Sequence, residues 1–313
     1  MVLKRCRTDR GWSDRVVHAI PLLIVGCAGL IVASSAVLAA PAPQFERQSQ
    51  PRSASQLVKI TLTSDAKRIG PGETFHLVVE FTIEPKWHIY WKNPGETGAP
   101  TEFDITGPNY DIGEPIFARP QRIEAPDGVT FGYEKRAVVV IPVTAPTNLG
   151  EGAAQFNFDI TYLVCKDVCL MGGPSMSIDI PTSATPTGHD NSLAALGRQL
   201  DASFPLPLKE LGGASASFDG SALAIIAPVG NDEEVTLFPI ELPGVTYEKA
   251  RIVHRDAMVH IIVPVSVKPE NALGEPMRIA GLIALGKERT DPCYEFELPV
   301  LVADERSADS SGN

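Results

Sequence analysis

Short β-like runs separated by glycine and proline constrain the fold of this chain more than any other feature. From Leu57 onward, runs such as LVKITLTSD and FHLVVEFTI alternate apolar and polar residues, as half-buried strands do. Turn residues recur about every ten positions, and helical periodicity is almost absent. The pattern predicts an all-β protein built from antiparallel β-sandwiches.

The strand pattern is interrupted between residues 183 and 213. This stretch is loop-like apart from NSLAALGRQLDASF, which has an Asn/Ser cap and the apolar spacing of a short helix. We therefore expect one sandwich over residues 57–182, a linker with a short helix over 183–213, and a second sandwich over 214–303. Residues 304–313 are polar and are expected to be disordered.

The amino terminus has the order of residues found in a secretory signal. Basic residues from Lys4 to Arg15 precede the apolar run AIPLLIVGCAGLIVASSAVLAA. Cleavage after Ala39 would make residues 1–39 a signal peptide and leave residues 40–56, rich in Pro, Gln and Ser, as a flexible spacer. Because the apolar run approaches the roughly 20 residues that span a bilayer, an uncleaved anchor is the alternative. In both cases the body of the protein is exported.

Charge and cysteine content limit which partners and which cysteine chemistry this chain can have. Removing residues 1–39 takes away five basic and two acidic residues, so the formal charge moves from −11 to −14. We expect no nucleic-acid partner, and membrane contact only through an uncleaved amino-terminal segment. The exported chain keeps Cys165, Cys169 and Cys293. In an oxidising compartment the close pair is expected to pass through a disulfide, while Cys293 is expected to be a buried or partly buried free thiol.

The geometry of strands predicts where the cysteine pair lies. Five apolar residues share one buried face of a strand, and Cys165 leaves that strand on the other, wetter face; they are Phe156, Phe158, Ile160, Tyr162 and Val164. Four extended residues would separate the Cα atoms of Cys165 and Cys169 by about 13 Å, whereas a disulfide needs less than about 7 Å. A bonded pair therefore requires that CKDVC turn back. Met176, Ile178 and Ile180 then alternate as the returning strand of a hairpin.

Three interpretations of the pair remain open from the spacing: a redox dithiol, a structural staple and a metal site. A five-residue loop gains only about 2 kcal/mol from closure, which weakens the staple. Lys166 favours a reactive thiolate, although Asp167 opposes it. The metal interpretation is a Cu(I) site of Cys165, Cys169 and Met171, with Met176 and His88 as further soft ligands. Ordinary packing also explains the methionines, and no Cys/His set has zinc spacing.

Three segments resemble a known family. WHIYWKNPGETGAPTEF (Trp87 to Phe103), FGYE (Phe131 to Glu134) and YLVCKDVCLMGG (Tyr162 to Gly173) occur in the order seen in the amino-terminal periplasmic domain of the thiol:disulfide interchange protein DsbD. The related domain of ScsB-type proteins, linked to suppression of copper sensitivity, is the nearer resemblance. The likeness covers residues 57–182 well and the second β block more loosely.

The resemblance implies a fold and a role. Both sandwiches would be immunoglobulin-like and lie in tandem, with Cys165 and Cys169 as the redox pair on a β-hairpin. Phe131, Gly132 and Tyr133 would form an exposed aromatic cap that shields the pair and opens for a partner.

The expected activity is thiol–disulfide exchange in the periplasm, without a cofactor. A full-length DsbD carries its own membrane and thioredoxin domains, and this chain is expected to carry neither. Electrons would therefore pass from a separate membrane thiol reductase to thioredoxin-like proteins. The alternative is a binding module without turnover, either a Cu(I) protein or an adaptor whose cysteines are ligands or a staple. The Trp87 to Trp91 stretch, including His88, is expected to pack in the core and to lead into a turn.

Overall fold

The computed structural model describes residues 53–107, 109–125, 128–231, 233–240, 244–268 and 278–299. The expected signal segment, most of the spacer and the tail lie outside these residues. All the described residues belong to one compact unit, residues 49–313. No helix in the described part of the chain is long and apolar enough to cross a membrane.

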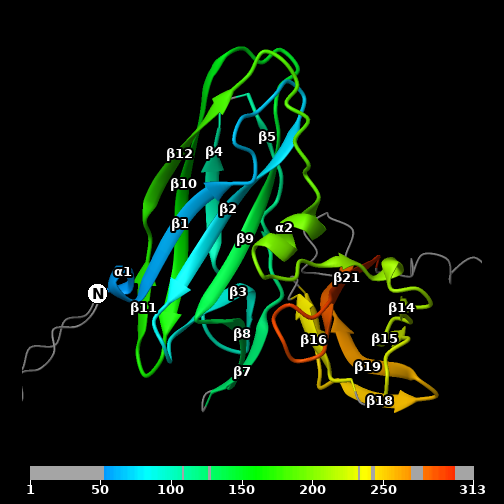
Figure 1. Cartoon of the computed structure of the whole chain (residues 1–313). Helices are drawn as coiled ribbons and strands as arrows, with labels where there is room; N and C mark the ends of the chain where they lie inside the picture. Colours follow the sequence, from blue (N-terminus) through cyan, green and yellow to red (C-terminus); the bar gives the residue numbers. More distant parts are fainter. Residues whose placement is uncertain are drawn as a thin grey trace, which may run out of the picture. The chain divides into compact units, whose positions relative to one another are not determined.

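The first β unit, residues 54–182, consists of two antiparallel sheets (Figure 1). Its elements are α1 (Ala54–Leu57), β1 (Val58–Ser64), β2 (Thr74–Ile83), β3 (His88–Gly95), β4 (Glu102–Thr106), β5 (Asp111–Ile112), β6 (Ile116–Phe117), β7 (Gln121–Ala125), β8 (Gly128–Glu134), β9 (Arg136–Thr144), β10 (Gly152–Cys165), β11 (Cys169–Gly172) and β12 (Ser175–Thr182). One sheet has the order β1-β2-β9-β5, with β6 also paired to β9; the other has the order β11-β10-β3-β8-β7, with β4 and β12 paired to β10. This confirms the all-β, immunoglobulin-like fold. Residues 54–56, expected in the spacer, are part of α1, where Ala54 is buried.

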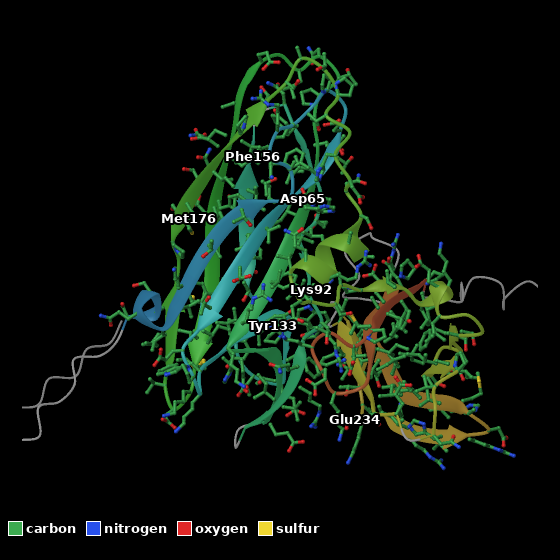
Figure 2. The ribbon with its side chains drawn as sticks, viewed as in Figure 1. Asp65, Lys92, Tyr133, Phe156, Met176 and Glu234 are labelled. Carbon is green, nitrogen blue, oxygen red and sulfur yellow. A yellow bond between two sulfur atoms is a disulfide. The ribbon has the colours of Figure 1, made fainter. Side chains whose placement is uncertain are left out.

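The core of the first β unit follows the alternation in the sequence. The five apolar residues of β10, from Phe156 to Val164, are all buried, and they face the buried odd-numbered residues of β2 from Phe75 to Phe81. The rings of Phe75 and Phe156 pack edge to face with centroids 5.9 Å apart. Phe156 is labelled in Figure 2 among the strands of this unit. The alternation predicted for β10 is therefore confirmed, and it fixes which face of β10 carries Cys165.

The second β unit, residues 206–299, adds two further sheets. Its elements are β13 (Leu206–Pro207), η1 (Leu208–Glu210), β14 (Ser215–Phe218), β15 (Ala222–Ala227), β16 (Val235–Ile240), β17 (Val245–Tyr247), β18 (Arg251–Arg255), β19 (Met258–Val267), β20 (Arg278–Leu285) and β21 (Cys293–Pro299). The sheets have the orders β13-β21-β20-β16 and β14-β15-β19-β17, with β18 paired to β19. Because β13 pairs with β21 in parallel, this unit begins inside the expected linker, before residue 214. A tandem of two immunoglobulin-like sandwiches stays a prediction.

The linker contains the short helix α2 (Leu193–Gln199), in the segment where a helix is expected. The Ser192 side chain caps it by accepting a hydrogen bond from the backbone N–H of Ala195. Leu196 and Phe204 pack against the outer face of the β2–β9 pair. Nearer the first unit, the carboxylate of Glu73 accepts hydrogen bonds from Thr187 and Gly188. Burial opposes this charge, but the hydrogen bonds outweigh it and lower the pKa of Glu73 to about 2.

Buried side chains join the two β units. The guanidinium of Arg119, which is buried, donates hydrogen bonds to the carbonyl oxygens of Leu285, Gly286 and Glu288 at 2.6–2.7 Å. Phe238 of β16 packs edge to face on Trp91, with centroids 6.0 Å apart. The strands that carry the site residues, β3 and β8, are therefore backed by the second unit as well as by their own core.

Candidate redox site

Cys165 and Cys169 form a disulfide at the tip of the β10–β11 hairpin. They are directly opposite each other in the strand register, with Cα atoms 4.2 Å apart. The turn between them is closed by a hydrogen bond from Lys166 N–H to the carbonyl oxygen of Val168. After β11 the chain continues as β12, which returns along β10 with Met176 opposite Phe158 (Figure 1). The predicted turn and returning strand are confirmed.

The two sulfurs of the pair have different access to solvent. Cys165 is only 2% exposed, whereas Cys169 is exposed. Val168 and Met171 beside it are 58% and 64% exposed, which is unusual for large apolar side chains. The wetter environment expected for Cys165 is therefore wrong, because its side chain is buried. Its face of β10 is solvent-exposed further back along the strand, but Cys165 itself lies between two paired strands and is covered.

Strand register defines a row of side chains across the outer face of this sheet. Cys169 is opposite Cys165, Cys165 is opposite His88 of β3, and His88 is opposite Glu134 of β8. Directly opposite residues in an antiparallel pair project to the same face. The disulfide, an imidazole and a carboxylate therefore lie side by side on one face of four successive strands.

Tyr90 extends this group of side chains along β3. It projects to the same face as His88 two residues away, and the two rings make an edge-to-face contact at 5.1 Å. Gly98, with φ of 102°, lies against the Tyr90 ring so closely that a Cβ there would be 2.1 Å from it. The hydroxyl of Thr101 donates a 2.6 Å hydrogen bond to the Tyr90 carbonyl. The loop between β3 and β4 thus covers Tyr90, which in turn contacts His88.

The expected aromatic cap is wrong for Phe131 and Tyr133. Both side chains lie within β8 and are buried, at 8% and 3% exposure. Tyr133, labelled in Figure 2, donates a hydrogen bond to the carbonyl of Ala118, and Phe131 packs on Phe238 at 5.1 Å. Since Glu134 shares the face of Cys165, the residues that alternate with it face the opposite side of the sheet. They therefore cannot shield the disulfide.

Gly132 is required by the close packing of β8 against β3. It is opposite Tyr90, and a Cβ at this position would lie 2.1 Å from the carbonyl oxygen of Ile89. Only glycine permits β8 to approach β3 so closely. The FGYE motif therefore sets the pairing of two central strands rather than forming an exposed loop.

The remaining candidate residues divide between the two faces. Lys166 forms an ion pair with Asp167 at 3.1 Å, so its charge is offset next to the disulfide. Met171 is opposite Leu163 and shares the face of the pair. Met176 is opposite Phe158 and half-buried against the core on the opposite face, so it cannot join a Cu(I) site with the cysteines. Among the described residues, no group of three or more His, Cys, Asp and Glu could hold a metal ion.

Cys293 is a buried free thiol, as predicted. Burial raises its pKa to about 11, although a hydrogen bond with Ser203 and the charge of Arg119 act in the other direction. A thiol that is both protonated and covered is inert, so among the described residues the reactive cysteine chemistry is confined to the hairpin pair.

Comparison with known proteins agrees with the pattern of these residues. Residues 58–177 match the family Thiol:disulfide interchange protein DsbD, N-terminal. The family resemblance drawn from the WHIYW, FGYE and cysteine segments is thus confirmed over this DsbD-like domain. No curated protein matches the chain in sequence.

Solved structures that are similar to this chain include two domains of thiol:disulfide interchange and ScsB proteins. The N-terminal periplasmic domain of ScsB from Proteus mirabilis is 16% identical, with a TM-score of 0.52 over 78% of this chain and 92% of its own. The Neisseria meningitidis DsbD n-terminal domain in the reduced form is 19% identical, with a TM-score of 0.25 over 42% of this chain and 88% of its own. At this identity the ScsB likeness establishes the fold.

The sequence alone does not predict that His88 lies beside Cys165. Alternation in WHIYW does predict that His88 and Tyr90 share one face of a strand. The strand that lies next to them, and its register, follow only from the folded arrangement.

Proposed function

We propose that this chain is an exported, periplasmic thiol–disulfide exchange protein. It passes electrons between a membrane thiol reductase and thioredoxin-like partners through the Cys165–Cys169 pair. The observation that carries the proposal is the asymmetry of the disulfide, which has one exposed and one buried sulfur on a hairpin tip. The match of residues 58–177 to the DsbD amino-terminal family supports it.

The asymmetry supports one order for the exchange. A thiolate of a dithiol reductant attacks the exposed Sγ of Cys169, because thiol–disulfide exchange requires direct access to the attacked sulfur. The Cys165–Cys169 bond breaks, and its electron pair leaves with Cys165 Sγ. A mixed disulfide then joins Cys169 to the reductant. The second thiolate of the reductant releases Cys169, which leaves the reductant oxidised and the pair reduced.

The neighbourhood of Cys169 favours a protein partner. Val168 and Met171 flank the exposed sulfur, and their exposed surface offers an apolar rim for docking. The ion pair of Lys166 with Asp167 leaves the turn without net charge. Docking would therefore rest on shape and apolar contact rather than on a strong charge of one sign.

The test is to trap the mixed disulfide with single-cysteine variants. Cys165→Ala leaves the exposed Cys169, and Cys169→Ala leaves the buried Cys165. On incubation with oxidised glutathione, Cys165→Ala is expected to gain one glutathione per chain by mass, and Cys169→Ala almost none. The Cys165→Ala/Cys169→Ala double variant controls for Cys293. Equal labelling of both single variants, or no labelling of either, would refute the proposed order.

A further inference from the structure

We propose that His88 is the proton donor and acceptor for the Cys165 sulfur during exchange. The inference rests on the proposed function, and it concerns the sulfur that the partner does not touch. It starts from the register, in which Cys165 is opposite Cys169 on one side and opposite His88 on the other.

Backbone geometry sets how closely the imidazole and the sulfur approach. Residues along an antiparallel strand alternate between wide, hydrogen-bonded pairs and narrow pairs without hydrogen bonds. The 4.2 Å Cα separation makes Cys165–Cys169 a narrow pair without hydrogen bonds. The backbone N–H and C=O groups of Cys165 therefore point toward β3, where Cys165 and His88 form a wide pair. Opposite side chains in such a pair have Cβ atoms about 5.5 Å apart. That separation puts Cys165 Sγ within reach of an imidazole nitrogen.

The burial of Cys165 creates the need for a proton donor. When the disulfide is attacked at Cys169, Cys165 Sγ leaves as a thiolate. At 2% exposure this anion gains little solvation from water, and burial disfavours the charged form of a thiol. A neighbouring group that supplies a proton or a charged hydrogen bond removes that cost.

The groups that face Cys165 identify the donor. On its own hairpin, Lys166 is already paired with Asp167, and Cys169 is the sulfur under attack. Across the sheet, His88 is the neighbour on β3, and Glu134 of β8 lies beyond it. Histidine is the side chain best suited to proton transfer near neutral pH.

Two neighbours orient the imidazole. Glu134 lies opposite His88 on the far side from the disulfide and projects to the same face of the sheet. Tyr90 contacts the ring edge to face and is itself held by the β3–β4 loop. We assign both as positioning residues.

The proton and electron steps balance. In reduction, the electron pair of the broken S–S bond goes to Cys165 Sγ, and the His88 imidazolium gives it a proton. In the return direction, Cys169 thiolate attacks an oxidised thioredoxin-like acceptor. Neutral His88 then takes the proton from Cys165, whose thiolate closes the disulfide and expels the acceptor as a thiolate. The acceptor is reduced, and the pair is oxidised again.

The experiment is the pH dependence of disulfide reduction in full-length protein. The rate of reduction by dithiothreitol is measured from about pH 5 to about pH 8, where histidine changes charge, and divided by the concentration of dithiothreitol thiolate. The wild-type quotient is expected to fall as pH rises. His88→Gln is expected to lose that pH dependence and to be slower by about 10²-fold at the acid end. His260→Gln, on β19 of the second β unit, is the matched control and is expected to follow the wild type.

Each result decides the proposal. A His88→Gln profile equal to the wild type, or one lowered in parallel at every pH, would overturn it, because a structural role lowers the rate without changing the profile. If wild-type protein is not reduced at any pH, the proposed function fails instead.

If the His88→Gln variant does not fold, a measurement on wild-type protein tests the proposal instead. NMR titration of the His88 ring is expected to give different midpoints in reduced and oxidised protein, because the group beside the ring changes from a disulfide sulfur to a thiol that exchanges a proton with it. Identical midpoints would overturn the proposal.

Discussion

Replacing both Cys165 and Cys169 by alanine is expected to cost about 2 kcal/mol of folding free energy and to leave the chain folded. The disulfide closes five residues, and the chain-entropy relation gives about 2 kcal/mol for a loop of that length. The β10–β11 register and the Lys166–Val168 hydrogen bond already hold the turn, so the disulfide adds little order. A domain of this kind has a total stability of about 5–15 kcal/mol, which the loss does not exhaust.

Urea denaturation followed by tryptophan fluorescence measures this cost. Oxidised wild type, wild type reduced with dithiothreitol and the double-alanine variant are compared, and the denaturant slope is expected to be similar in all three. Reduced wild type and the variant should unfold at nearly the same midpoint. A loss above about 4 kcal/mol, or an unfolded variant, would refute the reasoning and identify the pair as a structural staple.

Two further predictions test the cap and the charge network. Phe131→Ala is expected to lower stability by about 3 kcal/mol, through lost packing in the core, and to leave the rate of exchange at Cys169 unchanged; faster exchange would restore a shielding role for Phe131. Burial of Asp65 favours its neutral form, but its 2.7 Å contact with His76 Nδ1 and the neighbouring His189 outweigh this and lower its pKa. Since the folded pKa lies below the usual 3.8, this carboxylate stabilises the fold above about pH 4 and loses its contribution as the pH falls further. In Asp65→Asn, the free energy of unfolding measured by urea denaturation should therefore fall less steeply below about pH 4 than in the wild type. An equally steep fall would contradict the role given to Asp65.

Local patterns in the sequence predicted much of the fold. Features that depend on which strands lie side by side could not be predicted in this way. The alternation of β10 and the turn at CKDVC depend on neighbouring residues, so both could be read directly. The cap assignment failed because FGYE looks like a loop motif, whereas Gly132 is required by the close approach of β3 to β8. Cys165 was expected on a solvent-exposed face. Alternation shows the side of the strand to which a residue points, but it does not show which neighbouring strands cover that residue. The pairing of His88 with Cys165 depends on long-range register, which no local pattern specifies.

The boundary of the second β unit illustrates the same limit. Leu206–Pro207 reads as loop because proline cannot donate to a strand ladder, yet β13 adds to the edge of a sheet, where that donor is not needed. The contacts of Arg119 with the β20–β21 loop likewise join residues more than 160 positions apart. Such contacts are set by the packing of the whole unit.

The reduction potential of the Cys165–Cys169 pair tests the central claim most directly. Purified exported chain is equilibrated in graded dithiol buffers, and the free thiols are trapped by alkylation, with the double-alanine variant giving the background from Cys293. A potential well above about −300 mV is the predicted result, because it marks a disulfide that partners can exchange. A potential below that value would mean a disulfide that resists reduction, and it would contradict an electron relay through this pair.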